Sequence, residues 1–320
     1  MPRKLFLLLT SILSLDCAAQ LKWVRVDSLF GELPEGVHVY RSGDSINGRP
    51  NIAYYVAADL RNRNLLFDSD TTLGRRFTPQ EFYNRNTRPA IVVNCTFFSF
   101  ATHQNLGLVM KKGKLISYNQ HSLPGRGKDT MTYRHPLGSA IGISRKGWAD
   151  VSWLYTDSSA KLPYAFQRAL ALKKDSIAQI TLRDYLNSNK SGRAAKWNMQ
   201  TAVAGGPVLL QDGTVSISNN EEWKFVGSAV QDLHPRTGMG YTRDRKLIIL
   251  AVEGRNPGRA EGISLEEEAL IFRDLGCVEA LNLDGGGSSC LLVNGKETIK
   301  PSDKSGQRPV PAVFLIAQKP

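Results

Sequence analysis

The sequence predicts an α+β fold: a single domain with a large mixed β-sheet core, on which hairpins and a few capped helices pack. Three observations support this prediction. Short apolar runs bounded by glycine- and asparagine-containing turns recur along most of the chain, as is typical of strands. Helix-capping signals occur at only a few places. No linker-like stretch divides the chain into two parts.

The first third of the chain favours strands followed by one helix. Strands are predicted at 21–26, 37–40, 52–59 and 65–67. The segment Thr78-Pro79-Gln80-Glu81 is a capping box with proline at the first helical position, and it predicts a short helix to Arg85. Residues 90–93 then predict a buried strand that ends on a polar residue, Asn94.

The middle of the chain predicts three hairpins, each with a glycine in its turn. They pair 106–110 with 114–117, 140–144 with 149–153, and 208–210 with 214–217. Residues 156–200 are more polar and mixed, with a helix predicted near 181–186, and we interpret them as a peripheral insertion. Gly205 and Gly206 form a glycine-rich bend.

The last third contains a further hairpin and a second capped helix. The hairpin begins after His234, and its return strand, 247–252, ends on Glu253-Gly254-Arg255. Ser264-Leu265-Glu266-Glu267 is a capping box, and the predicted helix ends before Gly276. A buried strand, 280–283, follows and ends on Asp284, and the last strand, 311–317, is expected to pair inside the sheet.

Asn94 and Asp284 occupy comparable positions, because each ends a buried strand that follows a capped helix. If the two strands are neighbours, both side chains lie at one edge of the sheet. Ligands commonly bind at the carboxyl ends of such strands. We therefore place the candidate site at this edge.

Asp284 leads directly into three glycines, Gly285, Gly286 and Gly287, and then into Ser288. Successive glycines weaken a core, because they contribute no side chain and lose the most backbone entropy on folding. Such a run indicates close backbone approach, and its N–H groups can converge on one anion, as in phosphate-binding loops. The alternative interpretation is a tight hairpin turn.

Residues 1–19 carry the three-part pattern of a secretory signal peptide, with basic Arg3 and Lys4, an apolar stretch and small residues before Gln20. A lipid-modified Cys17 is the competing interpretation. No later stretch reaches the roughly 18 apolar residues that span a bilayer, so no transmembrane segment is expected. We expect the mature domain, residues 20–320, to be exported to the periplasm, the cell surface or the outside of the cell.

The formal net charge of +12 favours anionic partners such as phosphorylated glycans, nucleic acid or acidic membrane surfaces, and it does not choose among them. The basic residues are scattered rather than interleaved with aromatic residues in a stripe, so a nucleic-acid partner is not expected. Beyond Cys17, the cysteines are Cys95, Cys277 and Cys290. Either Cys277 pairs with Cys290 and leaves Cys95 free, or all three are reduced and buried.

The sequence contains no CxxC spacing or Cys/His cluster that would indicate zinc. We expect no required cofactor, and a bound calcium or magnesium ion stays an open alternative. The scarcity of closely spaced histidine and aspartate residues also disfavours the metal cluster that phosphodiesterases normally use.

Four motifs together carry a resemblance: NCTFF around Asn94, AGGPVLL from Ala204, HPRTGMGYTRDRKLIILAVEGR from His234, and NLDGGGSS around Asp284. In this order they resemble the phosphodiester glycosidase family, over roughly residues 52–317 and least within 156–200. The family usually reads RTAIG where this chain has Gly238 and Met239, and it often has aspartate where this chain has Glu253. These departures put the sugar specificity in question.

The resemblance implies a glycosidase that hydrolyses a sugar linked through its anomeric carbon to a phosphodiester, releasing the sugar and a phosphomonoester. The substrate would be a small or polymeric phosphorylated glycan. Negative charge develops on the leaving phosphate and positive charge on the sugar. Guanidinium groups suit the first and carboxylates the second.

On this basis we expect Asp284, Glu253 and Arg236 to be catalytic. The residues expected to bind the substrate or its phosphate are Asn94, Arg255, Gly285, Gly286, Gly287, Ser288, Gly205, Gly206 and His234. Phe97 and Phe98 either line the pocket or belong to the core. The alternatives are a non-catalytic glycan- or phosphate-binding module, and a phosphodiesterase that cuts the phosphorus–oxygen bond.

Overall fold

The computed structural model describes residues 20–125, 127–188 and 193–319. The predicted signal peptide, residues 1–19 with Cys17, lies outside the described residues. Strands dominate and a few helices pack on them, so the predicted α+β class is confirmed. Every strand pair in the described ranges is antiparallel, so the core consists of several antiparallel sheets rather than one mixed sheet.

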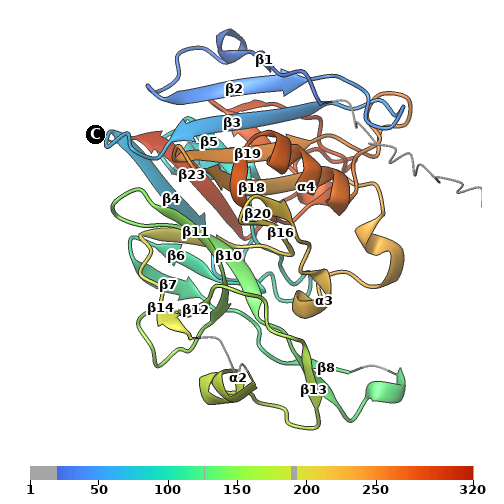
Figure 1. Ribbon diagram of the computed structural model, residues 1–320. Helices are drawn as coiled ribbons and strands as arrows, with labels where there is room; N and C mark the ends of the chain where they lie inside the picture. Colours follow the sequence, from blue (N-terminus) through green and yellow to red (C-terminus); the bar gives the residue numbers. More distant parts are fainter. Residues whose placement is uncertain (1–19, 126, 189–192, 320) are drawn as a thin grey trace, which may run out of the picture.

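Among the described residues, an eight-stranded sheet crosses the upper half of the molecule (Figure 1). Its strands, in spatial order, are β1 (Val24–Arg25), β2 (Val37–Ser42), β3 (Ala53–Asp59), β19 (Lys246–Val252), β18 (Arg236–Thr242), β20 (Cys277–Asn282), β16 (Val208–Gln211) and β17 (Thr214–Val215). Of the strand predicted over 21–26, only β1 forms. Leu21 and Trp23 instead pack near helix α4 (Leu265–Asp274).

Helix α4 (Leu265–Asp274) connects β19 to β20 and packs its buried face on this sheet. β18 lies between these two strands and is antiparallel to both, so β19 and β20 run in the same direction. The ends of β19 and β20 and the start of β18 therefore lie at one edge of the sheet. This topology brings Arg236, Glu253 and Asp284 to the same edge.

Below this sheet lies a seven-stranded sheet, again counting only described residues. It consists of β14 (Ala195–Lys196), β12 (Tyr164–Phe166), β11 (Ala149–Tyr155), β10 (Gly138–Ile143), β15 (Thr201–Ala204), β6 (Val109–Lys111) and β7 (Lys114–Ser117). The lower end of the molecule in Figure 1 contains β13 (Lys173–Asp175), β9 (Tyr133–His135), β8 (Leu123–Pro124) and helix α2 (Leu182–Ser188). The described residues within 156–200 thus form the strands β12, β13 and β14 and the helix α2.

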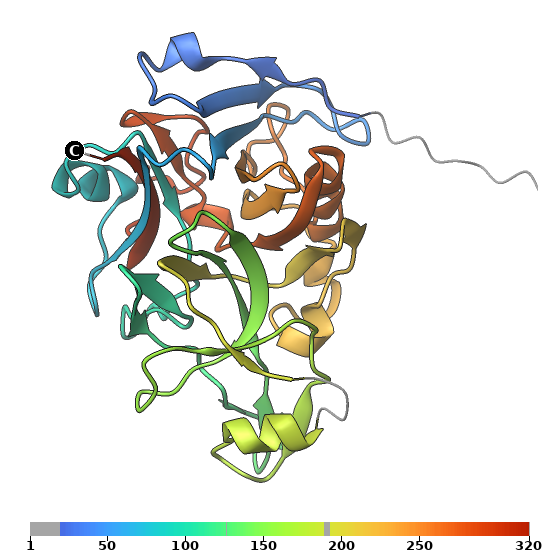
Figure 2. The same ribbon diagram turned by 60° about the vertical axis from the view of Figure 1, so that its left-hand side comes forward.

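A five-stranded sheet, in the same described ranges, completes the core. Its strands are β22 (Lys296–Glu297), β21 (Leu291–Val293), β5 (Ile91–Asn94), β23 (Ala312–Gln318) and β4 (Leu65–Thr71). Figure 2 shows helix α1 (Pro79–Arg85) and β23 on the opposite side of the molecule from α4. β23 lies between β5 and β4, which confirms that the last strand pairs inside a sheet.

Local sequence signals account well for these elements. The capping boxes of Thr78 and Ser264 are both present, and the three predicted hairpins form β6/β7, β10/β11 and β16/β17. The remaining helical turns are α3 (Asn219–Glu222), η1 (Asp27–Leu29), η2 (Gly127–Asp129), η3 (Gly227–Val230) and η4 (Gly286–Ser288). The main core cluster lies between the sheets and joins Val56, Val93, Ile141, Leu281 and Phe314.

Candidate active site

Asp284 lies where β20 of the eight-stranded sheet ends, and β5 of the five-stranded sheet ends beside it. The N–H of Asp284 donates to the carbonyl oxygen of Cys95 over 2.8 Å. The two strands do not pair with each other in the described sheets, so they are not the neighbours that a single sheet would make them. The common edge exists nevertheless, because residues 284–290 cross from one sheet to the other.

Asn94 is fully buried and holds this crossing in place. Its Oδ1 accepts hydrogen bonds from Oγ1 of Thr237 over 3.1 Å and from the N–H of Cys290 over 3.0 Å. Its Nδ2 donates to the carbonyl oxygen of Asp284 over 2.5 Å. The amide of Asn94 is therefore occupied by protein partners, and the side chain is placed to fix the loop rather than to contact a sugar, the role expected from the sequence.

Asp284 is partly buried. Burial raises its pKa to about 7, because the ionised form loses hydration. The nearby Ser288 hydroxyl, the guanidinium of Arg308 and the N–H of Gly285 act in the opposite direction. Asp284 therefore exchanges between its two protonation states near neutral pH, which is the property required of a general acid or base.

Two guanidinium groups lie against the glycine run that follows Asp284. A Cβ atom at Gly286 would come 2.9 Å from Nη2 of Arg255, and one at Gly287 would collide with the guanidinium of Arg308. Asp303 holds Arg308 through two hydrogen bonds of 2.7 and 2.8 Å. The glycines are therefore needed because two cationic side chains approach the main chain closely.

The main-chain N–H groups of this loop are largely committed to the protein itself. The N–H of Gly286 donates to the carbonyl oxygen of Pro235 over 2.8 Å, and that of Ser288 donates to the carbonyl oxygen of Gly285 over 3.2 Å. This arrangement differs from the expected nest of free N–H groups. Arginine side chains supply most of the positive charge at this loop.

Arg236 lies beside the glycine run, with its Cα atom 3.8 Å from the position of a Cβ atom at Gly285, and it is only 2% exposed. Its Nε donates to the carbonyl oxygen of Ile263 over 3.1 Å, and its Nη2 donates to that of Asp232 over 2.9 Å. Its guanidinium lies 5.7 Å from the ring centroid of Phe225. Within the described part of the chain it makes no ion pair, so no carboxylate in direct contact neutralises its charge.

Phe97 and Lys224 lie next to Phe225. Phe97 packs against Phe225 with ring centroids 6.1 Å apart, and Nζ of Lys224 lies 5.2 Å from the Phe97 ring centroid. Burial lowers the pKa of the Lys224 ammonium group. Phe98, in contrast, is buried in a core cluster. Of the two phenylalanines, only Phe97 contacts Phe225 and Lys224.

The side chains of His234 and Arg255 lie side by side. Nδ1 of His234 is 3.4 Å from Nη2 of Arg255, and Arg255 is exposed. Burial lowers the pKa of His234, and the charges of Arg236 and Arg255 lower it further. The imidazole is therefore neutral at pH 7. Its Nδ1 can accept a hydrogen bond from the guanidinium of Arg255, and the ring does not repel that charge.

Glu253 is 1% exposed and all of its hydrogen bonds are to protein groups. Its carboxylate accepts from Nε of Arg259 over 2.8 Å, from Nδ2 of Asn256 over 3.1 Å and from the N–H of Lys300 over 3.0 Å. The sequence predicts a catalytic role for Glu253. In the structure, its contacts with Asn256 and Arg259 hold the turn that carries Arg255.

Gly205 and Gly206 lie in a buried bend with a cis peptide bond before Pro207. The N–H of Gly205 donates to the carbonyl oxygen of Ser139 over 3.0 Å, and that of Gly206 donates to the carbonyl oxygen of Asn282 over 2.7 Å. Neither N–H is thus free for the phosphate contact expected from the sequence. A Cβ atom at Gly206 would collide with the buried carboxylate of Glu222 and would come 2.6 Å from Cε of Lys224, so this glycine makes room for both side chains.

Sequence reasoning missed Arg308, Asp303, Lys224 and Phe225. Arg308 and Asp303 lie in the loop before β23, and Lys224 and Phe225 follow α3, both outside the recognised motifs. The signal that points to them is spatial: they approach Gly287, Gly206 and Arg236. In the sequence, only Gly206 and Gly287 indicated that bulky side chains come close.

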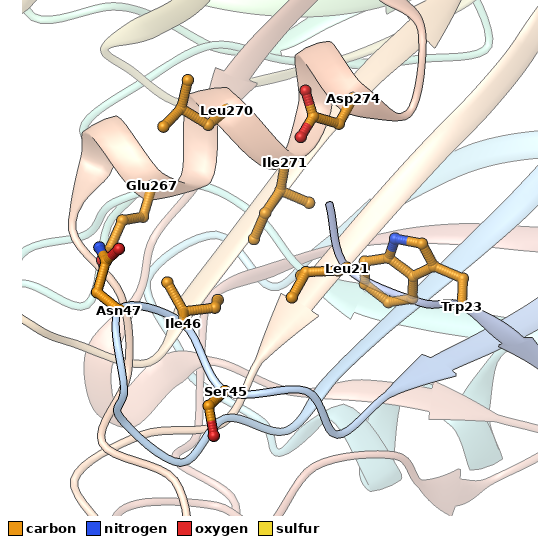
Figure 3. Close-up of a pocket in the computed structure, with 9 residues that line it drawn as sticks. All are labelled: Leu21, Trp23, Ser45, Ile46, Asn47, Glu267, Leu270, Ile271 and Asp274. Atoms are coloured by element: carbon orange, nitrogen blue, oxygen red, sulfur yellow. The ribbon is translucent and has the colours of Figure 1, made fainter. Parts of the chain in front are cut away.

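A separate pocket of about 120 Å³ lies between α4 and the N-terminal segments that carry residues 21–23 and 45–47 (Figure 3). It is lined by Leu21, Trp23, Ser45, Ile46, Asn47, Glu267, Leu270, Ile271 and Asp274. Its carboxylate Glu267 already caps α4 and accepts from Nδ2 of Asn47 over 2.7 Å. This pocket lacks the cations that surround Asp284, so we do not assign it to catalysis.

Cys95, Cys277 and Cys290 are buried and free among the described residues, and burial raises the pKa of the Cys95 thiol to about 12. This corresponds to the second of the two cysteine arrangements left open by the sequence. Groups of three or more histidine, cysteine or acidic side chains that could hold a metal ion are absent from the described ranges.

Comparisons with known proteins support the family resemblance over the second half of the chain, which holds three of the four motifs but not NCTFF around Asn94. Residues 154–317 match the family model described as phosphodiester glycosidase. N-acetylglucosamine-1-phosphodiester alpha-N-acetylglucosaminidase from Bos taurus is 35% identical over 109 residues, which are 32% of this chain and 20% of that protein. The chain thus matches about a fifth of that relative's length.

Two solved structures share the fold. A hypothetical protein from Synechocystis has a TM-score of 0.62 and 17% identity, covering 89% of this chain and 62% of that one. The catalytic domain of zebrafish N-acetylglucosamine-1-phosphodiester alpha-N-acetylglucosaminidase, auto-inhibited by its pro-peptide, has a TM-score of 0.57 and 17% identity, covering 95% and 92%.

Proposed function

The chain belongs to the phosphodiester glycosidase family, and from this premise we propose that it is an exported hydrolase of glycosyl-1-phosphodiesters. It cleaves the bond between the anomeric carbon and the phosphate oxygen, releasing the sugar and a phosphomonoester. The observation that carries the proposal is the carboxyl group of Asp284, with a pKa of about 7, beside the guanidinium groups that cover the glycine run.

The cations of the site match the charge that develops on the leaving group. When the carbon–oxygen bond breaks, its electron pair stays on the phosphate oxygen, and a guanidinium stabilises this charge by two-point hydrogen bonding. Arg255 is exposed and makes no ion pair within the described residues, so it is available to the phosphate. Arg308 lies over Gly287 and adds a second cation, already oriented by Asp303.

Asp284 acts on the sugar side of the bond. Its ionised form accepts a proton from the attacking water, whose oxygen forms the new bond to the anomeric carbon, and then returns the proton to solvent. The main chain of Asp284 is fixed on both sides, through Cys95 and Asn94. This fixation limits the reorganisation that the reaction requires.

Export rests on the signal-peptide pattern of residues 1–19. Among the helices that the structure describes, none is both long and apolar enough to cross a membrane. An exported enzyme of this kind would meet phosphodiester-linked glycans at or beyond the cell surface.

Hydrolysis in ¹⁸O-labelled water tests the proposed bond cleavage. With a synthetic glycosyl-1-phosphodiester, label is expected in the released sugar, because water attacks the anomeric carbon. Label in the phosphomonoester would mean attack at phosphorus and would overturn the proposal. Absence of turnover, with tight binding of the same diester, would favour the non-catalytic binding module instead.

A further inference from the structure

An exposed aromatic ring lies next to the candidate site and has no part in the proposed chemistry. Phe100 is 61% exposed, although its neighbour Phe98 is buried. The ring centroids of the two residues are 4.8 Å apart, so Phe98 supports Phe100 from within. Single exposed apolar side chains are common on protein surfaces, so the argument rests on what surrounds Phe100 rather than on its exposure.

The loop that presents Phe100 is well ordered by hydrogen bonds. The N–H of Ser99 donates to the carbonyl oxygen of Gln104 over 2.9 Å, and that of Leu106 donates to the carbonyl oxygen of Phe97 over 2.9 Å. Nδ2 of Asn105 donates to Oγ1 of Thr71 over 2.9 Å. Phe100 is therefore exposed by a fixed turn, which preorganises the ring for contact with a ligand.

Two arginines flank the ring. The guanidinium carbons of Arg76 and Arg308 each lie 5.5 Å from the centroid of Phe100. The strand segments that carry them are joined, because Phe77 and Val310 exchange main-chain hydrogen bonds of 3.0 and 2.8 Å. Arg76 makes no ion pair or hydrogen bond with any residue that the structure describes, whereas Arg308 is paired with Asp303. Arg76 thus leaves a positive charge available beside an apolar surface.

Arg308 links this surface to the candidate site. It lies over Gly287, and its charge acts on the carboxyl group of Asp284. The loop of Phe100 also begins at the site, because the carbonyl oxygen of Cys95 accepts the N–H of Asp284. A phosphate held by Arg308 would therefore direct the group on its far side toward Phe100 and Arg76.

We propose that Phe100, Arg76 and Arg308 form a subsite for the leaving-group side of the substrate, and that this side is a saccharide carrying a second phosphate. The subsite rests on the proposed function and narrows its substrate to phosphate-containing glycan polymers. The ring of Phe100 covers the apolar C–H face of the saccharide, and Arg76 binds the next phosphate. The net charge of +12 supports attraction of such a polyanion.

The test compares two substrates with the same sugar at the cleaved bond. In the short one the phosphate carries a methyl group, and in the extended one it carries a second sugar with its own phosphate. Phe100→Ala and Arg76→Gln are each expected to lower kcat/KM for the extended diester about tenfold, chiefly through KM, the effect of roughly one lost interaction of this kind. The loss on the short diester is expected to be clearly smaller.

Trp148→Ala is a matched control. Trp148 is 57% exposed and has the guanidinium of Arg245 at 4.1 Å, but it lies at the opposite end of β18 and β19 from Asp284. This control is expected to leave both substrates unaffected. Equal losses on the short and extended diesters for Phe100→Ala, or equal effects of Trp148→Ala and Phe100→Ala, would overturn the subsite.

A third substrate, with a nucleoside as the leaving group, tests the chemistry of the occupant. Equal dependence of this substrate on Phe100 would overturn the saccharide assignment, because a nucleobase also stacks on aromatic rings. If the wild type hydrolyses none of the diesters, the proposed function fails, and the subsite is then judged by binding of the extended diester. Weaker binding to Phe100→Ala than to Trp148→Ala would support it, and equal binding would exclude it.

Discussion

The side-chain amide of Asn94 donates a hydrogen bond of 2.5 Å to the main-chain carbonyl of Asp284, although the two residues end strands of different sheets. The same amide accepts from Thr237 on β18 and from the main chain of Cys290. One buried side chain thus joins β5, β18 and both ends of the loop that carries the glycine run. The geometry of Asp284 depends on this junction between sheets.

Replacing Asn94 with alanine should therefore destabilise the fold. The change leaves buried polar partners without hydrogen bonds, and we expect the free energy of unfolding to fall by about 2 to 4 kcal/mol. Denaturant unfolding measures this loss. Thr237→Val removes only one of the bonds and should cost about 1 kcal/mol. Equal effects of the two variants would contradict the role of Asn94 as a junction.

Asp284→Asn tests the proposed catalytic carboxyl group. Asparagine keeps the shape of the side chain but cannot take a proton from water, so kcat/KM for a glycosyl-1-phosphodiester should fall by about 10²-fold or more. Asp212→Asn serves as the control, because Asp212 is an exposed turn residue whose ion pair with Arg168 lies at the surface. Near-normal turnover by folded Asp284→Asn would remove Asp284 from the mechanism.

The raised pKa of Asp284 predicts a specific dependence of stability on pH. Between about pH 4, the usual pKa of aspartate, and pH 7, the folded protein binds more protons at this position than the unfolded chain does. The free energy of unfolding therefore falls as pH rises through this window. Asp284→Asn lacks this contribution, so its stability relative to wild type should increase from pH 4 to pH 7 and then level off.

Denaturant unfolding of both proteins at several pH values measures this difference. Glu268, buried in α4, contributes in the same direction, because burial raises its pKa to about 8. Glu268→Gln should therefore show its own relative gain, extending to about pH 8. A difference between wild type and Asp284→Asn that stays constant from pH 4 to 8 would show that the carboxyl group titrates normally.

Local signals in the sequence identified most elements, because capping and turn formation depend on neighbouring residues. Thr78 and Ser264 begin α1 and α4 as predicted, and the glycine-containing turns form hairpins. The sheet to which a strand belongs depends on contacts far along the chain. The sequence therefore placed Asn94 and Asp284 at one edge without revealing that two sheets meet there.

In the candidate site, too, residues in local motifs could be predicted and residues brought in by long-range packing could not. Asp284 and Arg255 lie in motifs, and the structure brings both to the glycine run. Arg308 has no motif around it, and its contact with Gly287 arises from the packing of the loop before β23 on the loop after β20. A glycine run signals that something approaches closely, but it does not identify the approaching group.

Gly287→Ala tests whether the glycine run exists to admit Arg308. The added methyl group would collide with the guanidinium of Arg308 and the carboxylate of Asp303, which are the ends of flexible side chains and can move aside. Because Gly287 does not have a positive φ, the backbone accepts alanine without strain. We therefore expect stability to change by about 1 kcal/mol or less.

Activity should respond more strongly than stability. Displacement of Arg308 removes one cation from the leaving phosphate, and kcat/KM should fall by at least about tenfold, as loss of one charged hydrogen bond predicts. Gly43→Ala is the control, since the nearest atom to its added methyl group is 3.9 Å away. Gly287→Ala with full activity would mean that Arg308 is not needed at this position, and of the two cations assigned to the phosphate only Arg255 would then remain.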